Sequence, residues 1–537
     1  MLTLKRLTLL AALVCVARGS DLGLKAGQPC KARNFGADSV VCVCTADYCD
    51  FLGNVTRGPE GTFTTVASSR DGLRFLVNTG ALSPTPVEGG VIIHVNHQYE
   101  YQTMMGFGGA FTDATGINIG TLPSDTQEVL LRSYFSPEGL EYNLCRVPIA
   151  GSDFSTRPYS YDDFEGDVEL KHFNLTEEDY LYKLPYIQRA IELSERDLLI
   201  LGSPWSPPAW MKENGHFNGS GGLLKEMWQP YSDYFVKFVQ SYEAEGVPIW
   251  GLTTQNEPLT GFEDWFWNTC AWTAEDQRDW IKTNLGPTLE AAGLRRIKLM
   301  VDDHNRDTLP WYPATILEDP KANEYVDGIA LHWYADDWTG PSVMDETQAM
   351  FPDKFLLYTE SCDGWDASAD ERVKLGDWFR AESYAYNIID VRIGLPVACS
   401  VGFWTMNHSR RVGDWNMALD MQGGPNWANN FVDFPLLSKR TQEVLKEARC
   451  SGEWATSASS SARGRDEPTP TSSGRNRSRP QLSTMIRAKP PSSLLTWGET
   501  AETTSVDIGD GTNYINFDLP AKAIVSLLFQ TPNAVAE

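Results

Sequence analysis

Two glutamates in this 537-residue chain each follow a run of mostly apolar residues. Residues 249–258 begin with the apolar and β-branched side chains of a buried strand and end in Asn-Glu-Pro. Pro258 has no N–H to donate to a sheet, so the predicted strand ends at Glu257. Residues 354–359 lead into Glu360 in the same way. Two carboxylates at the carboxyl ends of parallel strands could serve as the acid/base and the nucleophile of a retaining glycosidase.

The glutamates need a scaffold of strands, and eight candidate strands lie between residues 101 and 416. Helical patterns separate them, and one pattern places four residues on a single face at i, i+3, i+4 and i+7: Phe235, Phe238, Val239 and Tyr242. Alternating strands and helices in this number predict an α/β fold, a closed (β/α)8 TIM barrel. Besides the two strands that end at the glutamates, the candidates are residues 105–110, 143–148, 197–202, 297–301, 327–332 and 401–405.

The surroundings of the two glutamates must keep one carboxyl protonated and the other ionised. We predict mutual repulsion and apolar walls for Glu257, and a cation and a hydrogen-bond donor for Glu360. Arg146, after the second strand, is the predicted cation, and Tyr334, after the sixth, is the predicted donor. A structural ion pair inside the barrel is the alternative role for Arg146. Asn256, beside the acid, would hydrogen-bond the 2-hydroxyl of the sugar.

Composition argues against nucleic acid as a partner, and residue spacing argues against a metal site or a phosphate loop. With 45 basic and 71 acidic residues the net charge is -26, and such a surface repels phosphate. Asp302, Asp303 and His304 come nearest to a metal-ligand set, but we assign His304 to hydrogen bonding at a strand end. The glycines of residues 106–109 lack the spacing of a phosphate loop. We therefore expect no metal and no cofactor.

The first residues predict entry into the secretory pathway. Residues 1–20 have a charged start, a short apolar run and then small residues, which is the pattern of a signal peptide. In an oxidising compartment a cluster of four cysteines predicts two local disulfides, with a zinc site as the alternative: Cys30, Cys42, Cys44 and Cys49. N-x-Ser/Thr sequons predict glycosylation in a secretory chain, and our predicted sites are Asn54, Asn174 and Asn218.

The chain divides into several predicted units by composition and pattern. A small disulfide-bonded β unit (21–53, with part of 417–435) comes after the signal peptide (1–20). The first part of a β-sandwich (54–100) precedes the catalytic barrel (101–416). A Ser/Arg/Pro-rich segment (436–493), which we expect to be disordered, separates the barrel from the C-terminal strands of the sandwich (494–537).

Several longer motifs carry a family resemblance. They are Ser-Val-Val-Cys-Val-Cys (39–44), Gly-Phe-Gly-Gly-Ala (106–110), Ser-Pro-Trp-Ser (203–206), Asn-Glu-Pro (256–258), Ala-Leu-His-Trp-Tyr (330–334) and Gly-Gly-Pro-Asn-Trp (423–427). With these motifs the chain, from about residue 29 to residue 433, resembles the lysosomal acid β-glucosidases (glucosylceramidases) of glycoside hydrolase family thirty. The resemblance implies a retaining hydrolase that converts glucosylceramide to glucose and ceramide.

The resemblance also implies residue roles and partners. Glu257 would be the acid/base and Glu360 the nucleophile, and the disulfides would be Cys30–Cys42 and Cys44–Cys49. Implied partners are a saposin-type activator, an anionic membrane surface and a lysosomal transport receptor. The implied location is the lysosomal lumen, reached by the secretory pathway, with secretion as the alternative. Implied contacts to the glucosyl unit are Asp153, Trp205, Asn256, Trp415 and Asn426.

Two departures from the family pattern leave alternatives open. Residues 406–413 separate Trp404-Thr405 from Asp414-Trp415-Asn416, where the family has a compact run, so the position of Trp415 is open. The Ser/Arg-rich tract replaces the segment expected after residue 435. The alternatives are a related glycosidase acting on another β-glycan, such as a β-1,6-glucanase or a β-xylosidase, and an inactive glycolipid-binding form.

Aromatic residues follow two of the predicted strand ends. They are Trp265, Phe266 and Trp267, and then Trp333 and Trp338. Such a group could form a rim that receives lipid chains or touches a membrane surface. Packing beneath loops is the alternative explanation.

Overall fold

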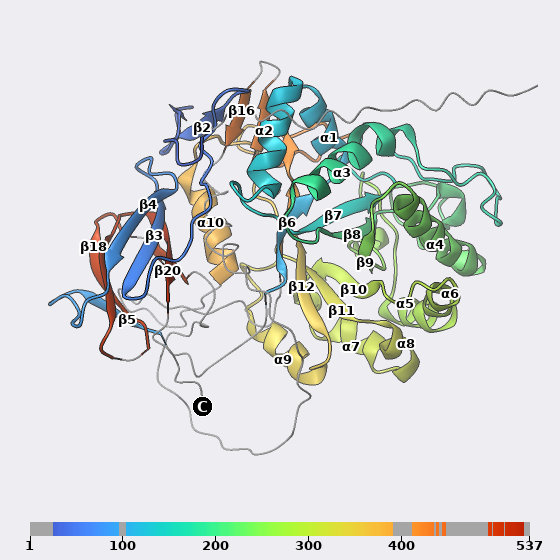
Figure 1. Cartoon of the computed structure of the whole chain (residues 1–537). Helices are drawn as coiled ribbons and strands as arrows, with labels where there is room; N and C mark the ends of the chain where they lie inside the picture. Colours follow the sequence, from blue (N-terminus) through green and yellow to red (C-terminus); the bar gives the residue numbers. More distant parts are fainter. Residues whose placement is uncertain are drawn as a thin grey trace, which may run out of the picture.

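Figure 1 shows a computed structural model of the chain, with a barrel ringed by helices, a β-sandwich at its side and a small sheet above. The structure describes residues 25–95, 104–389, 411–433, 436–439, 443–446, 492–496, 498–509 and 511–530. The predicted signal peptide and the candidate strand 401–405 lie outside these residues, as does the tract 447–491.

The central sheet has eight strands, and each recorded pairing between its neighbours is parallel. The N–H of Trp415 donates to the carbonyl of Ser361 at 2.8 Å, which brings the last strand beside β12. The predicted TIM barrel is therefore confirmed. In spatial order the strands are β12 (Phe355–Glu360), β11 (Gly328–His332), β10 (Lys298–Asn305), β9 (Ile249–Thr253), β8 (Leu199–Pro204), β7 (Leu144–Ile149), β6 (Gly106–Ala110) and β13 (Arg411–Asn416).

The eighth strand differs from the sequence expectation. β13 pairs with β6 and takes the place that we had assigned to residues 401–405. Asp414, Trp415 and Asn416 are part of this strand and are buried. The departure at residues 406–413 therefore does not remove Trp415 from the barrel.

Ten α-helices are found among the described residues. The predicted apolar face is confirmed in α4 (Trp228–Ala244), where Phe235, Phe238 and Val239 are fully buried. Over the part of the chain that the structure describes, no helix is both long and apolar enough to cross a bilayer. The other helices are α1 (Asp113–Gly120), α2 (Ser124–Phe135), α3 (Leu184–Leu193), α5 (Ala274–Trp280), α6 (Gly286–Ala291), α7 (Trp311–Leu317), α8 (Pro320–Tyr325), α9 (Ser342–Met350) and α10 (Trp378–Ile389).

The sandwich is built from two distant parts of the sequence. One sheet has the order β17-β20-β3-β4 and the other β19-β18-β5, with a shared apolar core that includes Ile93, Ile515 and Leu527. Helix α10 packs against it through Trp378 and Ile524. The strands are β3 (Thr62–Ser69), β4 (Leu76–Ala81), β5 (Val91–His94), β17 (Ser492–Thr496), β18 (Glu502–Asp507), β19 (Tyr514–Leu519) and β20 (Ala523–Phe529).

The small sheet corrects one expectation. It includes β15 (Leu436–Lys439) and β16 (Glu443–Lys446), at the start of the segment that we expected to be disordered. Val444 and Leu445 are buried, and β16 pairs with β2, so a short apolar stretch is enough to form a strand there. Disulfides Cys30–Cys42 and Cys44–Cys49 are formed as the family resemblance implied. The remaining strands of this sheet are β1 (Ala32–Arg33), β2 (Val41–Cys44) and β14 (Ala418–Leu419).

Candidate active site

A cavity of about 540 Å³ lies among the residues at and beyond the carboxyl ends of the barrel strands. This is the face at which TIM barrels carry their active sites. The cavity is lined by seven of the predicted site residues and not by Arg146 or Asn426. The seven are Asp153, Trp205, Asn256, Glu257, Tyr334, Glu360 and Trp415.

The two glutamates face each other in this cavity. Glu360 is the last residue of β12, whereas Glu257 lies in the loop after β9 with a φ of 44°. The Glu257 N–H donates to the carbonyl of Asp303 at 2.9 Å, which holds this loop against the end of β10. One oxygen of each glutamate and a ring nitrogen of His332 all lie within 4.8 Å of one another. The carboxylates are therefore close enough to act on one bond.

Arg146 is fully buried below the cavity and connects several of the strand ends. It donates to Glu360 Oε2, to Asp303 Oδ2 at 2.7 Å and to Asn256 Oδ1 at 2.8 Å. Its Nε donates to Ser203 Oγ at 3.0 Å. The predicted contact with Glu360 and the alternative buried ion pair thus occur together, because Asp303 is the second anion.

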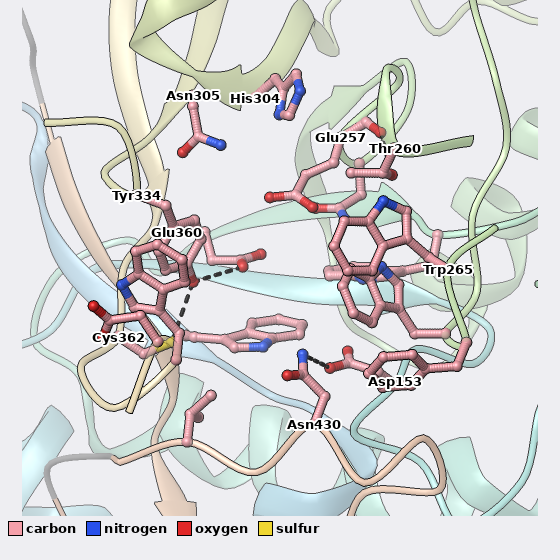
Figure 2. A pocket seen from close by; sticks show the side chains of 18 of the residues that line it. Asp153, Glu257, Thr260, Trp265, His304, Asn305, Tyr334, Glu360, Cys362 and Asn430 are labelled. Atoms are coloured by element: carbon pink, nitrogen blue, oxygen red, sulfur yellow. Dashed lines mark hydrogen bonds between the residues drawn. The ribbon is translucent and has the colours of Figure 1, made fainter. Parts of the chain in front are cut away.

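Tyr334 takes the place predicted for a donor to Glu360. Its hydroxyl donates to Glu360 Oε1 at 2.9 Å and lies 3.2 Å from Cys362 Sγ (Figure 2). Cys362 is buried and lines the cavity, and burial raises the pKa of its thiol well above the ordinary range. The thiol therefore keeps its proton and can donate it to the tyrosine oxygen.

His332, at the end of β11, was missed by sequence reasoning. Its Nδ1 lies 3.1 Å from Glu257 Oε1 and its Nε2 lies 3.2 Å from Asp303 Oδ1. Burial alone lowers the pKa of His332, but the charge of Glu360 and the hydrogen bonds to Asp303 and Glu257 outweigh burial and raise it to about 10. The ring is therefore a cation. Its only signal in the sequence is its place at a predicted strand end.

The charges in this cluster determine how many protons the glutamates hold. Two buried cations, Arg146 and His332, face three carboxyl groups. Burial raises the pKa of Asp303, yet the charge of Arg146 and the hydrogen bond with His332 outweigh it and hold the pKa well below the usual range. One proton shared by Glu257 and Glu360 therefore makes the cluster neutral, which burial favours.

The pKa directions of the two glutamates differ. Burial raises the pKa of Glu360 against the opposing charges of His332 and Arg146. For Glu257, burial is outweighed by the hydrogen bond and the charge of His332, which lower its pKa. These directions favour the shared proton on Glu360 in the free protein.

Residues 104–448 match the family described as the glycosyl hydrolase family 30 TIM-barrel domain. The chain belongs to this family. It is 41% identical over 420 residues to the lysosomal acid glucosylceramidase of Mus musculus, covering 76% of this chain and 78% of the mouse protein.

More distant proteins are also similar to this chain. An endo-1,6-beta-D-glucanase of Neurospora crassa is 38% identical over 246 residues, which is 44% of this chain and 50% of the fungal protein. The crystal structure of SrfJ from Salmonella typhimurium superposes with a TM-score of 0.73, at 22% identity, over 88% of this chain and 100% of that chain. This likeness supports the fold alone.

The glycosyl hydrolase family 30 barrel brings two predicted sugar contacts together. The rings of Trp205 and Trp415 stack with centroids 4.8 Å apart, and the Arg146 guanidinium lies 4.6 Å from the Trp205 ring centroid. Burial, reinforced by the charge of Glu360, raises the pKa of Asp153 to about 7. Asp153 also lines the cavity.

Asn430, and not the predicted Asn426, lines the cavity of this glycosyl hydrolase. Both side-chain amides donate to Asp153 Oδ2 at 3.1 Å. The Asn426 oxygen accepts from the N–H groups of Ala428 and Asn430, so Asn426 holds the loop. Figure 2 shows Asn430 directed toward Asp153 inside the pocket. The role of Asn426 as a sugar contact stays a prediction.

Aromatic side chains surround the mouth of the cavity. Trp265, Phe266 and Trp267 line it, and the rings of Trp265 and Trp267 stack with centroids 4.4 Å apart. Phe266 is 50% exposed. Trp333, in contrast, is buried and donates to the carbonyl of Cys362, which is the packing role given as the alternative.

One possible metal-ligand group lies in the site. Among the described residues, three groups of side chains have closely spaced ligand atoms, and two of them contain disulfide-bonded cysteines. The third is Glu257, His332 and Glu360. His332, whose pKa is raised to about 10, favours the protonated ring, in which both nitrogens carry a hydrogen. This group therefore fits a proton-holding role better than a metal.

The predicted glycosylation sites differ in exposure. Asn54 and Asn174 are exposed, which is the condition for glycan attachment. Asn218 is half-buried and donates to the carbonyl of Phe266 at 3.4 Å. Glycosylation at all three stays a prediction.

Proposed function

We propose that this chain is a retaining β-glucosidase that hydrolyses glucosylceramide to glucose and ceramide. The observation that carries the proposal is the approach of the Glu257 and Glu360 carboxylates, whose nearest atoms in the cluster lie within 4.8 Å. Retaining glycosidases hold the pair about 5–5.5 Å apart, whereas inverting enzymes need about 6.5–9.5 Å to admit a water. Identity of 41% with the mouse lysosomal enzyme supports the substrate.

The proposed reaction has two displacements. In the first, the Glu360 carboxylate forms a bond to C1 of the glucosyl unit, and the bond from C1 to the glycosidic oxygen breaks. Glu257 gives its proton to that oxygen, so ceramide leaves as an alcohol. In the second, Glu257 takes a proton from water, the water oxygen bonds to C1, and Glu360 is released as a carboxylate. Glucose leaves with its original anomeric configuration.

The neighbours of Glu360 support its role as the nucleophile. Arg146 and Tyr334 both donate to its carboxylate and favour the ionised form that attacks C1. The resting proton must therefore move to Glu257 before the first displacement, within a pair that titrates as a unit. Asn256 receives a hydrogen bond from Arg146 on its oxygen, which leaves its NH₂ group for the sugar 2-hydroxyl.

The lipid part of the substrate would meet the aromatic mouth. Trp265, Phe266 and Trp267 offer apolar surface next to the catalytic pair, and ceramide chains can pack there. From the mouse lysosomal relative we extend to this chain a lysosomal location and activity on a lipid substrate. A saposin-type activator, an anionic membrane surface and a lysosomal transport receptor are the proposed partners.

A mechanism-based cyclitol epoxide tests the nucleophile. Mass spectrometry of the digested, labelled protein should find the label on Glu360, and a label on any other residue would refute the mechanism. Turnover of glucosylceramide micelles, a fluorogenic β-glucoside and β-1,6-linked oligosaccharides then tests the substrate. Cleavage of the oligosaccharides alone would refute the glucosylceramide assignment.

The second candidate function is hydrolysis of a β-1,6-linked glucan. Its support is the fungal endo-1,6-beta-D-glucanase, 38% identical over 246 residues. The same substrate panel decides between the two activities. A protein that melts cooperatively but shows neither turnover nor labelling would instead be the inactive glycolipid-binding form.

A further inference from the structure

The carboxyl end of β10 is distorted next to the catalytic pair. Asp302 and Asp303 have φ values of 75° and 52°, and the pairing with β11 shifts register between Asp302 and His304. A positive φ is the left-handed backbone conformation, which is uncommon for residues other than glycine. It persists where the surrounding structure enforces it. A bulge of this kind redirects the side chains that follow it. Here those side chains belong to His304 and Asn305.

Both side chains line the cavity, and each also carries a buried polar atom without a partner in the described structure. His304 and Asn305 are half-buried, and His304 Nδ1 and Asn305 Oδ1 are buried without a hydrogen-bond partner among the described residues. Buried polar atoms are nearly always paired, so two adjacent exceptions need an explanation. Within the described structure no protein group pairs with His304 Nδ1 or Asn305 Oδ1, so a turn of either side chain would break no hydrogen bond at these atoms.

These residues lie beside the acid/base. The Glu257 N–H donates to the carbonyl of Asp303, the residue before His304. Figure 2 shows His304 and Asn305 at the edge of the pocket between Tyr334 and Glu257. Burial lowers the pKa of His304 against the opposing charge of Glu257, which favours the neutral ring, with one N–H and one lone pair.

We propose that His304 and Asn305 form a hydrogen-bonding subsite for the leaving group of the substrate. This rests on the proposed function, in which Glu257 protonates the glycosidic oxygen. The leaving group begins at that oxygen and extends away from the glucosyl unit. Ceramide carries an amide on the carbon next to its glycosidic CH₂ and a hydroxyl one carbon further on. These groups offer donors and acceptors at short range, whereas a simple alkyl chain offers none. The subsite selects leaving groups with polar atoms near the scissile bond.

The test compares two glucosides that differ only in the leaving group. His304→Leu and Asn305→Leu remove the polar atoms at similar side-chain volume. Each should lower kcat/KM for glucosylceramide by ~3–10-fold, the value of one lost hydrogen bond, with less than a twofold change for octyl β-glucoside. Glu263→Gln, an exposed position on the same cavity, is the matched control and should change both substrates equally. The rate of labelling by a cyclitol epoxide, which lacks a leaving group of this kind, should stay unchanged.

Two results would overturn the subsite. One is an equal loss on both glucosides, which would show a general structural defect, and the other is no loss on glucosylceramide. Failure of the proposed function looks different, because the unsubstituted enzyme would then cleave gentiobiose but not glucosylceramide. In that case the same variants are compared on gentiobiose and octyl β-glucoside, since the hydroxyls of the leaving sugar replace the ceramide amide. A selective loss on gentiobiose would support the subsite, and an equal loss or none would refute it.

Discussion

Two regions of the cavity differ in how their polar groups are hydrogen-bonded. One is the floor, formed by Asp303 and the side chains that contact it, and the other is the side wall, formed by His304 and Asn305. On the floor, Asp303 accepts from Arg146, Thr253 and Thr359 and contacts His332, so both carboxylate oxygens are in use. On the wall, the two residues that follow Asp303 in the chain leave His304 Nδ1 and Asn305 Oδ1 without a partner in the described structure. The carboxyl end of β10 thus contributes Asp303 to a saturated network, in which both of its carboxylate oxygens are bonded. The same strand end carries His304 and Asn305, each with an unpaired atom.

The difference separates catalysis from recognition. Dipoles and charges that are already fixed need no reorganisation as charge develops in the transition state, which is what a catalytic floor requires. A recognition surface must instead have free hydrogen-bonding capacity, because groups already paired inside the protein gain little from a ligand. Substitutions on the floor should therefore affect every substrate, whereas substitutions on the wall should affect only some.

The largest effect is expected for Glu360→Gln. The amide keeps the size of the carboxylate but cannot form the bond to C1, so kcat should fall at least ~10⁴-fold for all glucosides. Steady-state kinetics and epoxide labelling measure the loss, and thermal melting checks the fold. Residual activity above about 1% of the parent would contradict a nucleophilic role, since single removal of a nucleophile costs far more.

Arg146→Lys should have the next largest effect. Lysine cannot reproduce the planar fork that bonds Glu360, Asp303 and Asn256 together, so the floor loses fixed donors. We expect kcat to fall by ~10²–10³-fold with similar factors for glucosylceramide and octyl β-glucoside. Arg157→Lys is the matched control, because Arg157 forms a comparable two-bond pair with Glu178 outside the cavity lining. A loss confined to one substrate would contradict the division between floor and wall.

His332→Gln should move the pH dependence. The His332 cation lowers the pKa of both Glu257 and Glu360, so its removal should raise both. The pair works with one proton, so the acid limb of kcat/KM, where the pair takes up a second proton, and the alkaline limb, where it loses its last one, should both shift to higher pH. His216→Gln, an exposed histidine, should leave both limbs in place. Limbs that stay fixed or move to lower pH in His332→Gln would refute a cationic His332.

The barrel and its two glutamates could be predicted because they depend on local signals. Apolar runs define strands, and both glutamates lie within four residues of a strand or at its last position, although β9 ends at Thr253 and not at Glu257 as Pro258 had suggested. The roles of His332 and Asp303 could not, because their partners come from strands far apart in the sequence. Such contacts exist only once the barrel has closed.

Two further differences concern the last barrel strand and the loop that follows it. Residues 401–405 look more strand-like than the polar stretch 411–416, yet β13 forms at 411–416 because it pairs with β6 across the barrel seam. Asn426 and Asn430 are both asparagines in one loop. Their division into a loop-holding and a cavity-facing residue follows from hydrogen bonds to Ala428 and Asn430 N–H groups that spacing alone does not reveal.

The smallest effect is expected at the outer edge of the floor, at Cys362. Its thiol lies 3.2 Å from the Tyr334 hydroxyl, which in turn donates to Glu360. If the thiol donates to the tyrosine oxygen, it directs the tyrosine proton toward the nucleophile. Cys362→Ala should then lower kcat by ~2–10-fold with little change in KM, and Cys362→Ser should restore most of the loss, since serine keeps a donor.

A double-mutant cycle separates this orienting role from packing. In a Tyr334→Phe background the Cys362→Ala substitution should have no further effect on kcat, because the hydroxyl that the thiol directs is already gone. Cys270→Ala, which removes another buried thiol outside the cavity lining, should leave kcat unchanged in both backgrounds. Additive losses from Tyr334→Phe and Cys362→Ala would mean that the thiol acts only by filling space. The saturated network would then end at Tyr334.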